Sequence, residues 1–147
     1  MSTKSSCLTP GQLSAFLNGP HTARLACNDA NGLPYIVPLW HQWDGHRFWV
    51  IASERAKWVD YLRARPQVAL SIDDADTSRV LIQGRATIVE GPVSDGEWVP
   101  IARQMVCRYL GESAYPAYQS NTAGLKRWLI AVSADVVVSW RGPSRTD

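Results

Sequence analysis

Two cations stand close together in the stretch VIASERAKWVDYLRARP, residues 50–66, where a strand-like run meets a helix-like run. Arg55 and Lys57 fall in the first turn of the helix that the second run predicts. A helix N-terminus is already positive and usually attracts carboxylates, so cations at this place are unusual. Backbone N–H groups, the helix dipole and two cations together would bind an anion such as a phosphate. The alternative is a solvated basic turn, paired with Asp60 or Glu54.

Other residues of chemically active types form weaker patterns. His41 and His46 fall on one predicted hairpin, but two histidines without a third ligand rarely hold a metal ion. Asp73, Asp74 and Asp76 form the run DDAD, which lacks the glycine and the closing glutamate of a calcium-binding loop. The sequence also contains no Walker A, G-x-S-x-G or G-x-G-x-x-G motif. It therefore predicts no metal site.

The elements that must position these residues are mainly short strands. Asn31-Gly32 and Asp44-Gly45 are residue pairs that suit tight hairpin turns, and Gly84 predicts a bend or bulge within a long strand. Short strands with regular turn signals favour a small barrel, because closure removes exposed sheet edges. The six predicted strands are Thr22 to Cys27, Leu33 to Trp43, His46 to Ala52, Gln67 to Asp73, Arg79 to Glu90 and Trp128 to Trp140.

Three helices are expected at the joints of this sheet. A first helix is expected from Thr9 or Pro10 to Leu17, with Thr9 as its cap. The cationic helix is expected from Ser53 to Arg65. Apolar residues then recur with helical spacing from Trp98 to Tyr109, and Gly111 closes this third helix.

The Asp44-Gly45 turn predicts which residues face one another across the second and third strands. If Trp43 pairs with His46, then Trp40 faces Trp49 and both faces of the hairpin are apolar. A sheet with one wet face should alternate instead, so a helix, a ligand or a second subunit must cover the outer face. A homodimer is the expected solution. Its interface is expected to include the outer faces of residues 38–40 and 49–51.

Composition limits the classes of protein to which the chain can belong. With 147 residues it is expected to form a single domain over 1–147, with flexible tails at 1–8 and 143–147. A net charge of +2 does not suggest a nucleic-acid-binding protein, which usually has a strong basic stripe. The longest apolar run, WLIAVSADVVVSW, is far shorter than the roughly 20 residues that cross a membrane.

The cellular compartment is inferred from the start of the chain and from its cysteines. The first residues, MSTKSSCLTP, contain no apolar segment typical of a secretory signal. Cys7, Cys27 and Cys107 are odd in number and have no C-x-x-C spacing. They are therefore expected to be reduced thiols in a cytoplasmic protein.

Four stretches of the chain together form a family pattern. In order they are ARLACNDANGLPYIVPLWHQWDGHRFWVIAS, SERAKWVDYLRARPQVALSIDD, VLIQGRATIVEGP and VVVSWRG. Their order and spacing over about residues 12 to 142 resemble the flavin-binding split-barrel superfamily, the group related to pyridoxamine 5'-phosphate oxidase and to the deazaflavin-dependent reductases. The resemblance implies a mostly β protein with helices, a six-stranded split β-barrel (FMN-binding split barrel), which forms a homodimer with its cofactor site at the seam.

The resemblance also implies where the cofactor phosphate and the flavin ring lie. By position, Arg55 and Lys57 become the phosphate ligands, with Ser53 beside them. The implied ring contacts, along YIVPLW and the neighbouring strand, are Val37, Pro38, Leu39, Trp40, Ile51 and Ala52.

More distant contacts are implied at the fifth strand and at the C-terminal end. Arg79 takes the place of a polar flavin contact, while Trp140 and Arg141 would come from the partner subunit. Each residue also has a simpler interpretation: Trp40 and Trp140 as packing aromatics, and Arg79 as an ordinary edge charge.

Differences from the family pattern separate the chain from pyridoxamine phosphate oxidation itself. The arginine-histidine pair that relatives carry near the C-terminus is absent from VVVSWRGPSRTD. The resemblance therefore predicts an FMN-binding oxidoreductase, or a deazaflavin-binding one, that transfers hydride to a small molecule. Because the cofactor supplies the hydride chemistry, no side chain is predicted to be catalytic.

Two further functions remain open at the level of sequence. The first is a non-catalytic carrier of flavin or haem, in which His21, His41 or His46 would have to serve as the axial ligand of a haem. The second is a split-barrel dimer whose site is empty or repurposed. FMN is expected before a deazaflavin only because it is the usual ligand of the broader family.

Overall fold

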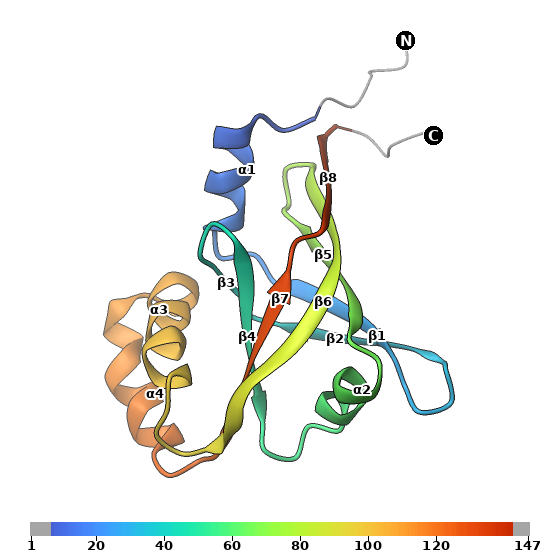
Figure 1. Ribbon diagram of the computed structural model, residues 1–147. Helices are drawn as coiled ribbons and strands as arrows, with labels where there is room; N and C mark the ends of the chain where they lie inside the picture. Colours follow the sequence, from blue (N-terminus) through green and yellow to red (C-terminus); the bar gives the residue numbers. More distant parts are fainter. Residues whose placement is uncertain (1–6, 143–147) are drawn as a thin grey trace.

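One strongly curled antiparallel sheet dominates the computed structural model, which describes residues 7–142 (Figure 1). The strands are β1 (Ala23–Asn28), β2 (Pro34–Leu39), β3 (Gln42–Trp43), β4 (Arg47–Ser53), β5 (Gln67–Asp73), β6 (Ser78–Val93), β7 (Arg127–Ser133) and β8 (Val136–Arg141). Their order across the sheet is β2-β1-β5-β6-β7-β4-β3, and β8 pairs with the first half of β6. This curled half-barrel agrees with the split barrel that the family pattern implies.

Helices join the strands and flank the sheet. They are α1 (Pro10–Leu17), α2 (Trp58–Ala64), α3 (Trp98–Leu110) and α4 (Tyr115–Thr122), with a short 3-10 turn η1 (Glu112–Ala114) before α4. The prediction for α1 is confirmed, since Thr9 Oγ1 accepts from the backbone N–H of Gln12 at 3.2 Å. The prediction for α3 is also confirmed, and Gly111 ends it with φ +93°.

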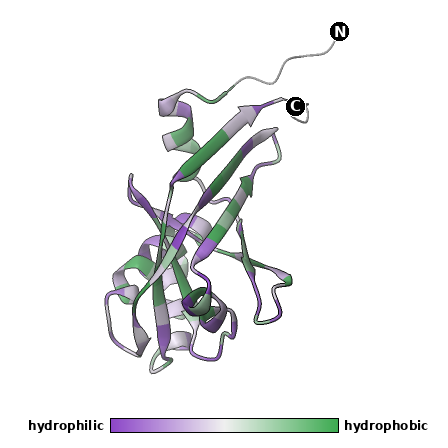
Figure 2. Ribbon diagram, turned by 45° about the vertical axis from the view of Figure 1, so that its right-hand side comes forward, coloured by the Kyte–Doolittle hydropathy of each residue, from purple (hydrophilic) through white to green (hydrophobic). Residues whose placement is uncertain are grey.

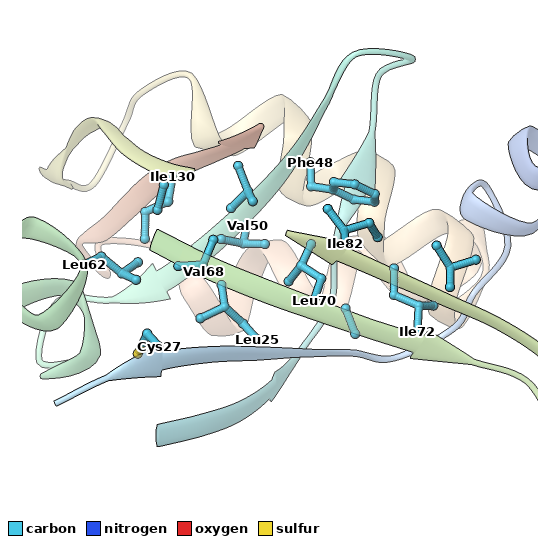
Figure 3. Packing of buried hydrophobic residues seen from close by; sticks show 14 of the residues in the cluster. Leu25, Cys27, Phe48, Val50, Leu62, Val68, Leu70, Ile72, Ile82 and Ile130 are labelled. Carbon is cyan, nitrogen blue, oxygen red and sulfur yellow. The ribbon is translucent and has the colours of Figure 1, made fainter. Parts of the chain in front are cut away.

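The concave side of the sheet holds the main core. In β4 and β5, buried residues alternate with partly or fully exposed ones, as a sheet with one packed face requires. Leu25, Phe48 and Leu70 are fully buried and gather with their neighbours inside the curl (Figure 3). Leu8, the last residue of the expected tail at 1–8, is buried in this core. Residues 1–6 of that tail, and the whole of the second expected tail at 143–147, lie outside the described residues.

The long strand β6 connects the two halves of the sheet. Its first part pairs with β5 and β8, and from Ala86 onward it pairs with β7. Gly84 lies at this transition, where an added Cβ would be 1.7 Å from the carbonyl oxygen of Ser133. Gly84 therefore permits a close backbone approach rather than a bulge. The register irregularities of β6 lie further along, between Ile88 and Val93.

Within residues 7–142 the sheet has eight strands, so the predicted number of six is wrong. The predicted strand Leu33 to Trp43 divides after Leu39, because β2 pairs with β1 whereas β3 pairs with β4. The predicted strand Trp128 to Trp140 divides at residues 134–135, because β7 pairs with β4 while β8 pairs with β6. Each break is the point at which the chain changes its partner strand.

The predicted register of the hairpin at Asp44-Gly45 is wrong as well. Trp43 pairs with Phe48, not with His46, and Trp40 precedes β3 without facing Trp49. Asp44 causes the wider turn, because its Oδ1 accepts from the backbone N–H groups of both residues 46 and 47, at 2.8 and 2.7 Å.

Helix α3 accounts for the apolar outer face of this region. Trp49 and Ile51 of β4 pack against a second hydrophobic cluster whose buried members are Trp98, Ala102 and Leu129. Of the three possible covers considered from the sequence, a helix of the same chain therefore takes this role. Figure 1 shows α3 and α4 side by side on the β4 side of the sheet.

Candidate functional site

Two adjoining cavities lie at the end of β4 and the start of β7, and the first of them also faces the helices α3 and α4. The first, here named the aromatic cavity, has a volume of about 330 Å³ and is lined by Leu39, Trp40, Ile51, Ala102, Met105, Tyr118 and Arg127. The second, here named the basic cavity, has a volume of about 280 Å³ and is lined by Ser53, Glu54, Arg55, Leu125, Lys126 and Arg127. Arg127 lines both, so the two cavities adjoin at this residue, and together they are here named the two-part groove, with an aromatic end and a cationic end.

The sheet register builds the cationic end. Ser53 is the last residue of β4 and pairs with Arg127, the first residue of β7. Val93 of β6 pairs with Arg127 from the other side. The turn after β4 then brings Arg55 beside the strand start, and Lys126 immediately precedes Arg127. Three cations and one carboxylate, that of Glu54, thus surround a small cavity.

Arg127 has an unusual environment at the point that the two cavities share. Its Nε atom is buried but has no hydrogen-bond partner among residues 7–142. Arg108 Nε and Trp140 Nε1 are also buried without a partner in this range, but neither residue lines the two cavities. Buried polar atoms are nearly always hydrogen-bonded, so an orphan donor of this kind requires an explanation. An anionic or carbonyl oxygen of a bound molecule would satisfy it.

The aromatic end is apolar with few polar groups. The ring of Trp40 stacks on Tyr109, with centroids 4.8 Å apart and planes 6° apart. Tyr118 of α4 adds a phenol, and burial raises the pKa of Tyr118 although the charge of Arg127 opposes the shift. Flat aromatic surfaces and a few convergent polar groups are typical of sites for small planar ligands.

The structure brings together five of the residues that the resemblance implied. Leu39, Trp40 and Ile51 line the aromatic cavity, and Ser53 and Arg55 line the basic cavity.

The other implied residues lie outside the two linings. Val37 packs against the main core, Ala52 is buried inside it and Pro38 is exposed on β2. Arg79 and Trp140 are paired across β6 and β8 on the sheet, and the Arg79 guanidinium donates to the backbone oxygen of residue 142 at 2.8 Å.

The expected cationic helix start is wrong in one respect. Ser53 continues β4 through its pairing with Arg127, so the chain cannot enter a helix there. Arg55 lies in a turn, and α2 begins only at Trp58, with Lys57 at its N-cap and no side-chain cap. Lys57 is exposed and lines neither cavity. The cations of the site therefore come from a turn and a strand start, and not from a helix N-terminus.

The sequence matches the family model described as pyridoxamine 5'-phosphate oxidase over residues 9–137, most of the chain. The chain belongs to the pyridoxamine 5'-phosphate oxidase family. This confirms the resemblance to the flavin-binding split-barrel group that the four stretches indicate. None of the curated proteins matches the chain.

Several solved structures share the fold of this family member. The structure of an F420 reductase has a TM-score of 0.68 at 23% identity, and the match covers 84% of this chain and 94% of the reductase chain. An FAD-binding protein from Mesorhizobium loti has a TM-score of 0.67 at 18% identity, with coverages of 95% and 99%. A haem storage protein from Vibrio cholerae has a TM-score of 0.67 at 19% identity, with coverages of 90% and 96%. At these identities the likeness establishes the fold alone.

Sequence reasoning missed several residues of the groove in this family member. Lys126 and Arg127 are two adjacent cations at the start of a strand, and this pair is visible in the sequence. Only the β4–β7 register shows that the pair lies beside Ser53, so the sequence did not connect it with the site. Met105 was assigned only to the apolar face of α3. Tyr118 lies on α4, which was not predicted, although Pro116 in its first turn is typical of a helix start.

The three histidines differ in their availability as ligands. His41 is fully buried, with Nε2 at 3.0 Å from the carbonyl oxygen of Leu17 and Nδ1 at 3.1 Å from the hydroxyl of Tyr109. Both nitrogens are engaged, so His41 is not free to bind a haem iron. His21 stacks on Phe16, and neither His21 nor His46 lines the two cavities.

Among residues 7–142, no group of three or more His, Cys, Asp or Glu side chains is placed to hold a metal ion. In the same part of the chain, none of the helices has the length and apolar character needed to cross a membrane.

Proposed function

We propose that this protein binds FMN in the two-part groove and uses it to transfer hydride to a small organic molecule. The observation that carries the proposal is the position of Arg127. It lines both cavities, and its buried Nε donor has no partner within residues 7–142. A phosphorylated flavin has an anionic end and a planar ring end, and the groove offers a complementary surface to each.

At the basic cavity, this chain's own residues would hold the phosphate. The hydroxyl of Ser53 can donate one hydrogen bond, and Arg55, Lys126 and Arg127 supply positive charge around the cavity. Hydrogen bonds to a charged acceptor contribute about 1.5–3 kcal/mol each. None of these three cations forms an ion pair with another residue of 7–142.

At the aromatic cavity, apolar side chains would orient the ring and exclude water. Leu39 and Ile51 approach from the sheet, Met105 from α3 and Tyr118 from α4, while Trp40 provides a flat wall. When bound, the flavin would supply the hydride chemistry itself. The protein would supply orientation and a water-poor surrounding, so no acid or base from this chain is assigned.

The competing possibilities concern the cofactor and its use. A deazaflavin would fit the same two-part arrangement, since it also joins a planar ring to a phosphate. A flavin carrier without catalysis would keep the same contacts. The groove offers no free histidine to a haem, because His41 is engaged on both sides and the other two lie elsewhere.

A reconstitution experiment tests the proposal. The purified protein is loaded with FMN, reduced with dithionite and mixed with a quinone as hydride acceptor. Oxidation much faster than that of free reduced FMN supports an oxidoreductase. Binding without acceleration indicates a carrier, and the absence of FMN binding rejects the proposal.

The proposal also includes a homodimer, and the face we assign to it differs from the predicted one. The outer side of β2, β1, β5, β6 and β8 carries a groove of about 500 Å³. Its lining includes Ile36, Leu81 and Val136, which are 64%, 43% and 49% exposed. Figure 2 shows the first half of the last strand in green, the colour of hydrophobic residues. An exposed apolar area of this extent favours a protein partner, and a second copy agrees with the family resemblance.

A single charge placed in this face tests the dimer. Leu81→Glu should convert a dimer into a monomer in light scattering. Val89→Glu, on the same strand but outside the lining of this outer apolar groove, should not. A monomeric wild-type protein at micromolar concentration would contradict the assignment. The pair Arg79 and Trp140 borders this face, which is compatible with a seam position for Trp140.

A further inference from the structure

Trp40 and His41 form the corner at which the chain passes from β2 to β3. The Trp40 ring lines the aromatic cavity on one side and stacks on Tyr109 of α3 on the other. His41 points the opposite way and packs edge-to-face against Phe48 in the core, with centroids 5.5 Å apart. These three residues, Trp40, His41 and Tyr109, are named the aromatic corner. The orientation of the Trp40 ring, which forms the flat wall of the cavity, therefore depends on the position of the Tyr109 ring.

The hydroxyl of Tyr109 ties α3 to two other parts of the fold. It donates to the carbonyl oxygen of His21 at 2.7 Å, lies 3.1 Å from Nδ1 of His41 and accepts from the backbone N–H of His41 at 3.3 Å. A phenol that makes contacts in three directions cannot rotate out of its place without breaking all of them. The Tyr109 ring is consequently fixed relative to two segments, the chain before β1 and the chain at His41.

The protonation state of His41 follows from its second nitrogen. Nε2 lies 3.0 Å from the carbonyl oxygen of Leu17, which can only accept, so Nε2 carries the hydrogen. Burial lowers the pKa of His41 to about 4, and the charge of Arg108 acts in the same direction. The neutral ring thus offers Nδ1 as an acceptor to Tyr109. The single phenol hydrogen therefore has two acceptors, the carbonyl oxygen of His21 before β1 and Nδ1 of His41 after β2.

Arg108 fixes the backbone of the same corner from α3. Its guanidinium donates to the carbonyl oxygen of His41 and to the side-chain oxygen of Gln42. It also lies over the ring of Tyr109, with 4.7 Å between the guanidinium carbon and the ring centroid. Adjacent residues of one helix therefore hold both the backbone and the aromatic support of Trp40.

We propose that Tyr109 and His41 are positioning residues that hold the Trp40 ring in one orientation as a rigid wall of the aromatic cavity. Neither residue lines either cavity, so they act through Trp40 and do not touch the ligand. The proposal rests on the proposed function only for the identity of the ligand. The orientation itself is a property of the ligand-free protein, and it can be measured without FMN.

The first test observes Trp40 in the ligand-free protein. With fluorotryptophan incorporated, the ¹⁹F NMR signal of Trp40 among the seven tryptophans is assigned by its loss in Trp40→Phe. Tyr109→Phe keeps the aromatic ring but removes the hydroxyl, so the Trp40 signal should shift or broaden. Tyr35→Phe, on the exposed part of β2, serves as the matched control and should leave it unchanged. An unchanged Trp40 signal in folded Tyr109→Phe would overturn the proposal.

The second test is a double-mutant cycle on FMN affinity. Tyr109→Phe should weaken binding about threefold to tenfold, the size that one hydrogen bond has in a binding equilibrium. In a Trp40→Ala background the same change should cost less than twofold, because Tyr109 then has no ring to position. Equal losses in both backgrounds would overturn the proposal.

Two provisions keep these tests decisive. If Tyr109→Phe does not fold, His41→Gln replaces it, since its amide can still donate to the Leu17 carbonyl while the contact with Tyr109 is lost. If the wild-type protein binds no FMN, the proposed function fails, and the NMR experiment alone then decides whether the corner positions Trp40.

Discussion

The two ends of the groove differ in how completely their polar groups are bonded. At the aromatic corner, His41 uses both ring nitrogens and Tyr109 makes three contacts through one oxygen. At the basic cavity, Arg55, Lys126 and Arg127 gather around about 280 Å³, and a buried Nε has no partner within residues 7–142. The Nε of Arg108 at the corner is also buried without a partner in this range, but its terminal nitrogens donate to His41 and Gln42. The hydrogen bonds among residues 7–142 include none from the side chain of Arg127, which leaves its guanidinium available to an anion. Changes at the corner should therefore affect stability, and changes at the basic cavity should affect binding.

The largest expected effect is on the affinity for FMN. Arg55→Ala/Arg127→Ala removes two charge-assisted contacts, which corresponds to about 3–6 kcal/mol and to more than a hundredfold loss in affinity. The melting temperature of the ligand-free protein should stay level or rise, because two like charges have been removed. Isothermal titration and thermal unfolding on the same sample measure both quantities.

A charge-matched control separates the site from the general charge of the protein. Arg85→Ala/Arg103→Ala removes two exposed arginines outside both cavities and should change affinity less than threefold. Comparable losses in the two double variants would show that the cavity has no special role.

The second effect concerns acid stability and belongs to the corner. Burial lowers the pKa of His41 from its usual 6.5 to about 4, so the unfolded chain takes up a proton at higher pH than the folded one does. The stabilisation is complete above about pH 6.5 and is lost as the pH falls toward 4. The loss over that window is at most about 3 kcal/mol.

Urea unfolding at several pH values measures this loss. His41→Gln should flatten the profile between pH 6.5 and 4, while the basic-cavity variant Arg127→Met should keep the wild-type profile. An unaltered slope in His41→Gln would mean that another group causes the acid sensitivity.

Sequence patterns predicted the local elements better than their partners. The Thr9 cap, the helix ending at Gly111 and the strand Gln67 to Asp73 were correct because their signals lie within a few residues. The division at Trp40 and at residues 134–135 was missed, because a change of partner strand leaves no local mark.

The same reason explains the partial success with the site. Arg55 and Ser53 were found from their own stretch, aided by the family resemblance. Arg127 was not found, because it reaches the site only through its pairing with Ser53, 74 residues earlier in the chain. Lys57 was assigned to the site on the assumption of a helix that begins at Ser53, whereas α2 begins at Trp58, after Lys57.

A matched pair of substitutions, Arg108→Met and Arg127→Met, sharpens the comparison further. Arg108 donates to two groups of the corner, so Arg108→Met should lower the free energy of unfolding by about 1–2 kcal/mol. Arg127→Met removes a side chain whose Nε is unpartnered within 7–142, so the free energy of unfolding should change by less than about 0.5 kcal/mol. Chemical denaturation without ligand checks both values. Equal losses in the two variants would remove the distinction between the ends.

The smallest expected effect is that of Lys57→Ala. Because Lys57 is exposed and lines neither cavity, its removal should change FMN affinity by about twofold or less. Arg55→Ala alone should cost tenfold or more, since one charge-assisted bond contributes about 1.5–3 kcal/mol. A loss for Lys57→Ala that equals the loss for Arg55→Ala would restore Lys57 as a phosphate ligand.

The most direct measurement compares FMN with riboflavin, which has the same ring without the phosphate. If the basic cavity holds the phosphate, the wild-type protein should bind FMN at least about a hundredfold more tightly than riboflavin. Arg55→Met should reduce that ratio strongly while changing riboflavin affinity little, because Arg55 lines the basic cavity and not the aromatic cavity. Equal affinities of the wild-type protein for FMN and riboflavin would contradict the assignment of the basic cavity.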